Sequence, residues 1–151
     1  MDAKALAAEY DALILPRFTE VEALELGRLL TAMALKDLAP VVIDIRSPDR
    51  ILFHAALPGS APLNDRWIAR KSATALLFQL PSLLVGQRNR EKDETLAKHG
   101  LSTDSYADHG GAVPIRVAGV GVVACVTVSG LPQVEDHRLA MRGLAALLAH
   151  L

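Results

Sequence analysis

Tyr106-Ala-Asp-His-Gly-Gly-Ala-Val-Pro-Ile115 is the stretch that decides the fold, together with Val126-Thr-Val-Ser-Gly-Leu-Pro-Gln-Val-Glu-Asp-His137. The first stretch is a polar, glycine-containing entry into an apolar strand. The second is a strand that ends at Ser-Gly-Leu-Pro and leads into a helix. The short Ala118-Gly119 segment between them predicts a tight turn, which joins a strand over residues 111–117 to a strand over residues 121–129. We therefore expect a hairpin whose ends carry most of the reactive side chains of the C-terminal third.

Outward from this hairpin, hydrophobic periodicity predicts helices over residues 3–15, 20–36, 65–79 and 132–150, with one or two short helices over residues 81–98. Thr19 and Glu22 form a capping-box pattern before the second helix, and Asn64-Asp65 is predicted to cap the third. Gly27 costs the second helix about 1 kcal/mol relative to alanine, which close packing against a neighbour would explain.

Apolar runs over residues 41–45 and 51–56 flank the turn sequence Ser47-Pro-Asp-Arg50 and predict a second hairpin. Hairpins that are separated from one another, without alternating strand–helix–strand units, favour an α+β domain with helices packed on an antiparallel sheet. No repeat or linker divides the sequence, so residues 1–151 are expected to form a single domain.

The composition is apolar and nearly neutral in charge. The 151 residues are 51% hydrophobic and carry a formal net charge of −1, without a basic stripe, so no nucleic-acid partner is expected. The high apolar content calls for a sheet covered on both faces or for an interface in a homo-oligomer. The single cysteine, the amphipathic N-terminal segment and the lack of an 18-residue apolar run predict a soluble, cytoplasmic protein without a membrane span.

Asn64, Trp67 and Lys71 fall at positions i, i+3 and i+7 and therefore share one face of the third helix. An amine beside a tryptophan can bind a carboxylate or make a cation–π contact. The alternative interpretation is structural, because a lysine often lays its methylene groups along an apolar helix face.

Two glycine-containing segments offer a place for a ligand. Ser129-Gly130 ends a strand just before a helix, where free backbone N–H groups favour an anion, although it can equally be a turn that requires a glycine. His109-Gly110-Gly111 would let a backbone approach a ligand closely, or it simply begins the strand.

Asp136-His137 lies at the start of the last helix. His137 could act as a general base, a metal ligand or a ligand of haem, but it also begins an apolar stripe and fits a core position equally well. Asp136 suits the first helical turn as a charge that complements the helix dipole. No CxxC or HExxH spacing is present, so no metal site is expected, and no GxSxG motif supports a Ser129–His137 hydrolase. The catalytic residues, if any, stay unassigned.

These motifs resemble the haem-degrading-domain (HbpS/GlcG-like) superfamily, and within it a branch of small cytosolic proteins. The resemblance covers the chain from about residue 40 onward and is carried by the pattern Asn64-x-x-Trp67-x-x-x-Lys71 and by the two stretches quoted first. It implies a profilin-like α/β/α sandwich with a five-stranded antiparallel sheet, and assembly into dimers or larger homo-oligomers. Four strands are evident, so the fifth is expected between residues 80 and 110. Some relatives bind haem, but the branch that this chain resembles has no settled activity.

Together these observations predict an oligomeric protein that binds a small anionic ligand, with haem or another tetrapyrrole as one candidate cofactor. The ligand would lie between the helix of Asn64 and the corner at Ser129. Lys71 would meet a carboxylate, Trp67 would form a flat wall, and His109 or His137 would be the polar or axial contact. Gly110, Gly111 and Gly130 would allow close backbone approach. The alternatives are an interaction or scaffold protein without catalysis and, last, a hydrolase that uses Ser129 and His137.

Overall fold

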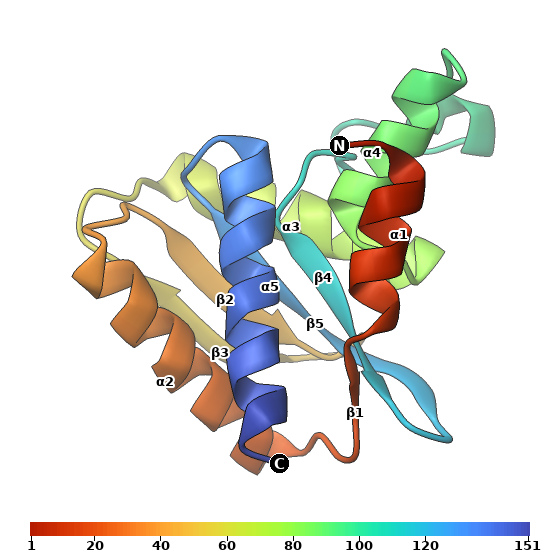
Figure 1. Cartoon of the computed structure of the whole chain (residues 1–151). Coiled ribbons are helices and arrows are strands. Elements are labelled where there is room, and N and C mark those ends of the chain that lie inside the picture. The colour runs from red at the N-terminus through yellow and green to blue at the C-terminus, as the bar shows by residue number, and fades with distance from the viewer.

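The computed structural model describes the whole chain, residues 1–151, as helices on both faces of one five-stranded sheet (Figure 1). In chain order the elements are α1 (Ala3–Asp11), β1 (Ile14–Leu15), α2 (Glu20–Lys36), β2 (Val42–Arg46), β3 (Ile51–Ala56), α3 (Pro62–Phe78), α4 (Ser82–Glu91), the 3-10 helix η1 (Leu96–His99), β4 (Ala112–Val117), β5 (Gly121–Ser129) and α5 (Gln133–Ala149). Helices α2 and α5 cover one face of the sheet and α3 covers the other. The α+β class predicted from the sequence is confirmed.

The strand order in the sheet is β1-β4-β5-β2-β3, which places β5 at the centre and β3 at one edge. Both predicted hairpins form, β2 with β3 and β4 with β5, and β2 also pairs antiparallel with β5. The sheet is nevertheless mixed, because β1 pairs parallel with β4. The expectation of a purely antiparallel sheet is therefore wrong.

The fifth strand is β1, so the prediction that it lies between residues 80 and 110 is also wrong. That region forms α4 and η1, as the predicted short helices require. Residues 14–15 were expected to end the first helix, but α1 stops at Asp11 and the chain extends along β4, where Ile14 lies opposite Arg116 and Leu15 opposite Val117. A strand of two residues is too short to show the alternation by which strands are identified.

The N-terminal segment is fixed to β4 by side chains as well as by the strand. The hydroxyl of Tyr10 donates a hydrogen bond to the carbonyl of Pro114 at 2.8 Å. In return, the Arg116 guanidinium donates to the carbonyl of Tyr10 at 2.6 Å and lies 3.9 Å from the centre of its ring. These contacts join the first fifteen residues to the C-terminal hairpin.

The main hydrophobic core lies between the sheet and the pair α2 and α5. Two glycines allow close packing, one between α2 and the sheet and one between α5 and α2. A Cβ atom on Gly27 of α2 would lie 2.5 Å from the ring of Phe53 on β3, and one on Gly143 of α5 would lie 2.4 Å from Leu30. The close packing expected at Gly27 is thus present.

Helix α3 begins earlier than predicted, at Pro62, with Ala61 as its N-cap residue. Proline fits the first turn of a helix because an N–H group at that position has no acceptor within the helix, so nothing is lost when it is absent. Asn64, predicted to be the cap itself, lies three residues further on, and its side-chain oxygen accepts the Ala61 N–H at 2.9 Å. The capping role of Asn64 is real, but it is exerted from inside the helix.

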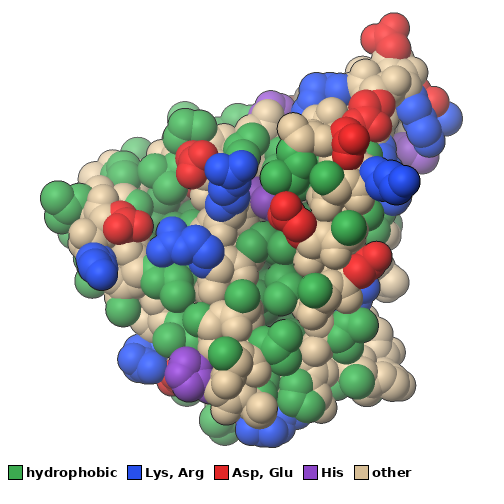
Figure 2. Space-filling model, in the orientation of Figure 1, with side chains coloured by type: hydrophobic (Ala, Val, Ile, Leu, Met, Phe, Trp, Pro, Cys, Tyr) green, Lys and Arg blue, Asp and Glu red, His purple; other side chains and the backbone are tan.

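The outer surface mixes apolar and charged side chains, as the face of α2, α5 and α1 shows (Figure 2). Several large apolar side chains of α2 and the segment after it are exposed, Val21, Leu24 and Leu38 most strongly. No helix combines the length and the apolar character that crossing a membrane would require.

Candidate ligand-binding site

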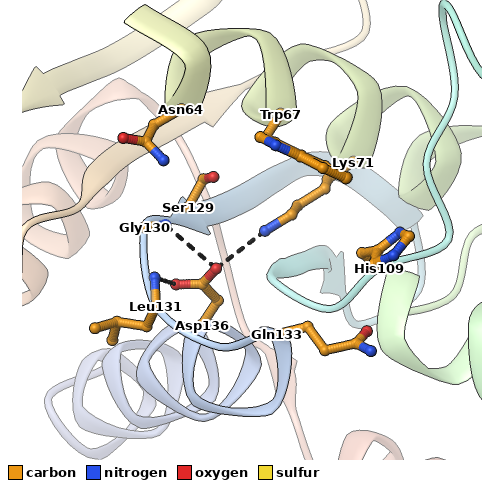
Figure 3. A pocket seen from close by; sticks show the side chains of 9 residues that line it. All are labelled: Asn64, Trp67, Lys71, His109, Ser129, Gly130, Leu131, Gln133 and Asp136. Atoms are coloured by element: carbon orange, nitrogen blue, oxygen red, sulfur yellow. Dashed lines mark hydrogen bonds and ion pairs between the residues drawn. The ribbon is translucent and has the colours of Figure 1, made fainter. Parts of the chain in front are cut away.

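A small polar pocket of about 280 Å³ lies where α3 passes over the end of β5 and the start of α5 (Figure 3). Its lining comprises Asn64, Trp67, Lys71, His109, Ser129, Gly130, Leu131, Gln133 and Asp136. Seven of the ten residues singled out in the sequence are in this set, and they come from three segments that are far apart in the chain.

Helix α3 supplies one wall through Asn64, Trp67 and Lys71, which project from the same side of the helix (Figure 3). At about 100° per residue, the positions i, i+3 and i+7 fall within about 60° of one another around the helix axis. The helix face predicted from the sequence is therefore the face that the pocket uses.

The corner at Ser129-Gly130 supplies the opposite wall and already holds an anion of the protein's own. The carboxylate of Asp136, in the first turn of α5, accepts the Leu131 N–H at 2.9 Å and the Gly130 N–H at 3.3 Å. Gly130 has a φ of +147°, and a Cβ there would lie 2.3 Å from the carbonyl of Pro40. The free N–H groups expected to attract a ligand are thus partnered by Asp136.

Lys71 reaches across the pocket to the same carboxylate. Its Nζ atom donates to Asp136 Oδ2 at 3.1 Å and to the carbonyl of Val128 at 3.3 Å, and its side chain is 4% exposed. Burial lowers the pKa of Lys71 below that of a free lysine, against the attraction of Asp136. Burial likewise raises the pKa of Asp136, against the attraction of Lys71. The two groups form a buried pair whose pKa values are drawn toward one another.

Two amide side chains near the pocket already use their oxygens as hydrogen-bond acceptors. Asn64 Oδ1 accepts the Ala61 N–H, and Gln133 Oε1 accepts the Gly110 N–H, each at 2.9 Å. Since a backbone N–H can only donate, each amide must direct its oxygen to that partner. The nitrogen of Asn64 consequently points into the pocket (Figure 3).

Three further donors point into the same space. The Trp67 indole nitrogen and the Ser129 hydroxyl face the pocket between Asn64 and Lys71 (Figure 3). Neither atom is among the fully buried polar atoms, so both are open to a ligand. An ammonium carries three N–H groups, and Lys71 uses two of them within the protein. The pocket therefore offers several free donors, whereas its carboxylate and amide oxygens are already occupied.

His109 closes one side of the pocket. Its ring meets the ring of Trp67 edge-on, with 5.0 Å between the centres, and its side chain is half exposed. The Arg70 guanidinium lies 4.4 Å from the centre of the Trp67 ring. Partial burial lowers the pKa of His109, and Asp108 offsets this only in part, so the imidazole is neutral at pH 7.

Gly110 and Gly111 do not line the pocket but make room for the groups that do. A Cβ on Gly110 would lie 2.5 Å from the carbonyl of Gln133. One on Gly111, where φ is +139°, would lie 2.3 Å from the carbonyl of Val128 and 2.9 Å from Lys71 Nζ. The close approach expected at these glycines is made by the protein's own backbone and by the lysine.

His137 lies away from the pocket. It is 2% exposed, lines a separate small cavity between α1, α4 and α5, and neither ring nitrogen has a hydrogen-bond partner. It therefore makes no hydrogen bond with Ser129. Burial lowers the pKa of His137 to about 4.

A second polar cluster lies beside the pocket and was not anticipated from the sequence. His54 on β3 bonds Asp44 on β2 at 2.7 Å and Asp65 on α3 at 2.6 Å, and Arg46 donates two hydrogen bonds to the same Asp44. Carboxylates only accept, so His54 must carry a proton on each nitrogen. Partial burial acts to lower the pKa of His54, but the bonds to Asp44 and Asp65 outweigh it and raise that pKa. No group of three His, Cys, Asp or Glu side chains is arranged to hold a metal ion.

Leu131 and Gln133 are pocket residues that the sequence did not reveal. Both follow the Ser129-Gly130 corner, and Gln133 joins that corner to the loop of Gly110. The only available signal was their position beside the corner, because neither residue type is specific to a ligand site.

The fold and the pocket define a class: an α+β domain with a small polar site at the end of its central strand. Comparison with known proteins identifies the family, since the model of the "Haem degrading protein HbpS-like" family matches residues 18–145. A UPF0303 protein of Streptomyces coelicolor is 54% identical over 133 residues, covering 87% of this chain and 84% of that protein. The chain therefore belongs to the HbpS-like family, as its motifs indicated.

Solved structures agree with this assignment. The crystal structure of the Ybr137w protein matches with a TM-score of 0.91 and 35% identity, covering 99% of this chain and 89% of that one. The structure of a PduOC–haem complex matches with a TM-score of 0.71 and 17% identity, covering 85% and 94% of the two chains, and this likeness concerns the fold alone.

Proposed function

We propose that the chain binds a small carboxylate-containing ligand in the pocket between α3 and α5. The observation that carries this proposal is the convergence of free donors, the Asn64 amide, the Trp67 indole and the Ser129 hydroxyl, around the remaining N–H of Lys71. A cavity whose free groups are mainly donors, and whose carboxylate and amide oxygens are already used, favours a ligand rich in acceptor oxygens.

The size of the pocket supports a small ligand. Its volume of about 280 Å³ is below the range of roughly 300–1,000 Å³ typical of sites for larger organic ligands. Lys71 is already paired with Asp136 and the other free donors are neutral, so the pocket favours a ligand with no more than one negative charge. Short monocarboxylates meet both conditions.

Haem is the second candidate, favoured by the family's description and by the haem complex of the structurally similar PduOC. The pocket itself does not fit the macrocycle. Of the nine lining residues only Trp67 and Leu131 are hydrophobic, and about 280 Å³ is too little to enclose a tetrapyrrole. A propionate group could enter among the donors, but the ring would have to lie outside. We therefore assign no haem ligand and propose the small carboxylate as the ligand.

Trp67 provides the test, because it is the only tryptophan of the chain and lines the pocket. Titration with lactate should change the Trp67 fluorescence saturably. The neutral analogue lactamide should need about tenfold higher concentration, because it cannot accept charge-assisted hydrogen bonds. In parallel, haem titration followed by Soret absorbance should give no shift at stoichiometric haem.

A matched pair of variants locates the ligand. Asn64→Asp keeps the oxygen that caps α3 but replaces the inward N–H₂ with a second oxygen, and it should weaken lactate binding more than about tenfold. Gln79→Glu adds the same charge at the exposed far end of α3 and should leave binding unchanged. Unaltered binding by Asn64→Asp would refute the assignment to this pocket. A Soret shift that Asn64→Asp abolishes would favour haem instead.

A further inference from the structure

We infer that Lys71 forms a protonated imine with the carbonyl group of a 2-oxo acid held in the pocket. This inference rests on the proposed carboxylate site and names the class of substrate. It requires a buried amine that faces the cavity, a group that moves protons beside it, and donors that place a carbonyl carbon next to the nitrogen.

Lys71 is the buried amine. The chain has four other lysines, all exposed to solvent: Lys4, Lys36, Lys92 and Lys98. The Lys71 side chain is 4% exposed, and its nitrogen ends inside the pocket between Val128 and Asp136 (Figure 3). Gly111 is part of this arrangement, because any side chain there would occupy the space around Nζ. The fold thus buries one lysine side chain only.

Asp136 is the proton carrier. Its Oδ2 atom lies 3.1 Å from Lys71 Nζ, and the Leu131 and Gly130 N–H groups hold the carboxylate in place. Burial lowers the pKa of Lys71 and raises the pKa of Asp136, so transfer of a proton from the ammonium to the carboxylate costs less than it would between exposed groups. A neutral amine is the form of lysine that attacks a carbonyl.

The free donors of Asn64, Trp67 and Ser129 line the same pocket as the amine and would take the carboxylate. In a 2-oxo acid the carbonyl carbon is bonded directly to the carboxylate carbon. A carboxylate fixed by these donors therefore places the carbonyl beside Lys71, which neither a simple ketone nor a hydroxy acid achieves.

The reaction balances without an oxidant or a reductant. Asp136 takes one proton from the Lys71 ammonium, and the amine nitrogen forms a bond to the carbonyl carbon. The carbonyl oxygen then takes up two protons, one returned by Asp136 and one lost from the nitrogen, and the C–O bond breaks to release water. The product is a protonated imine whose positive charge stays paired with the Asp136 carboxylate, as the ammonium was before.

Reduction of the imine to a stable amine tests the inference on the wild-type protein. The chain is incubated with pyruvate and cyanoborohydride, and the adduct is located by peptide mass spectrometry. We expect one reduced pyruvate adduct, on Lys71, with the four exposed lysines labelled at least about tenfold less. Acetone, which lacks the carboxylate, should label Lys71 at least about tenfold less than pyruvate. Lactate, which lacks the carbonyl, should give no adduct and should compete with pyruvate.

Lys71→Met, confirmed as folded by circular dichroism, should lose the adduct while the exposed lysines keep their background labelling. The inference is overturned if pyruvate labels all five lysines equally or labels none. If lactate still changes the Trp67 fluorescence saturably in that case, the binding site stands and only the imine chemistry fails. If neither lactate nor pyruvate changes the fluorescence, the carboxylate site fails as well.

Discussion

Asp136 and His137 are neighbours in the sequence, and the sequence alone could not decide which of them serves the pocket. Successive residues of an α-helix point about 100° apart, so the two side chains cannot both face the same cavity. Asp136 turns toward Lys71, whereas His137 turns toward α1 and α4. Helical spacing did predict that Asn64, Trp67 and Lys71 share a face. The ion pair across 65 residues was not predictable, because no local pattern records a contact between distant segments.

His137 is predicted to make the protein sensitive to acid. Its folded-state pKa of about 4 lies below the ordinary value of 6.5, so the unfolded chain binds the extra proton first. The stability that neutral His137 allows is present above pH 6.5 and is lost as the pH falls toward 4. Between pH 7 and pH 5 the free energy of unfolding should fall by about 2 kcal/mol for this reason. Urea unfolding of wild type and His137→Leu at the two pH values measures it.

His137→Leu should unfold with a smaller loss of stability between pH 7 and pH 5. It should also be about 1–3 kcal/mol more stable at pH 7, because it removes two buried ring nitrogens without partners. His99→Gln replaces an exposed histidine and serves as the control, with the pH dependence of the wild type retained. Equal pH slopes for wild type and His137→Leu would contradict the prediction.

The elements differ in how far local sequence determines them. The capping box of Thr19 and Glu22 forms as predicted, and α2 and the two hairpins follow their periodicity. The start of α3 was misplaced by two or three residues, because Asn64 carries a capping side chain that acts from the third helical position. The short strand β1 forms because it pairs with β4 and because Tyr10 contacts that strand. Its two residues are too few to show a periodic pattern in the sequence.

Gly27 is predicted to stabilise the protein relative to alanine, although glycine has the lower helix propensity. Alanine there would favour the helix by about 1 kcal/mol, but its methyl group would meet the Phe53 ring at 2.5 Å, and overpacking of this kind costs about 1–3 kcal/mol. Gly27→Ala should therefore have a lower free energy of unfolding, by up to about 2 kcal/mol, in chemical denaturation. Combining it with Phe53→Leu should recover part of the loss. An increase in stability for Gly27→Ala alone would contradict the prediction, because it would mean that Phe53 moves aside at little cost.

Over the whole molecule, the apolar composition is only partly explained by the core. The sheet is covered on both faces, as predicted, yet Val21, Leu24 and Leu38 remain exposed on the outer side of α2 and beyond it. The apolar content called for a covered sheet or for an interface in a homo-oligomer, and the family resemblance implied the oligomer. Neither could indicate the face, because exposure depends on how distant elements pack. We therefore predict that such an assembly would bury the outer side of α2, where Val21 and Leu24 are exposed.

Leu24→Glu is accordingly predicted to lower the mass of the particle in sedimentation, because it would place a charge at the centre of the apolar surface of α2. Leu77→Glu is the matched control. It changes another exposed leucine, on α3 at the opposite face of the sheet, and should leave the mass unchanged. A mass that Leu24→Glu does not alter would place the assembly surface elsewhere or show that the chain is monomeric.

The attachment of the first fifteen residues to β4 has a consequence for the order in which a ribosome can complete this fold. Translation delivers Tyr10, Ile14 and Leu15 about a hundred residues before Pro114 and Arg116, to which they bind. The leading segment must therefore wait, without its strand partner, until most of the polypeptide has been made. Contacts so distant in sequence are slow to close and form late. This segment is thus made long before its partner strand and is among the last parts to reach its native place.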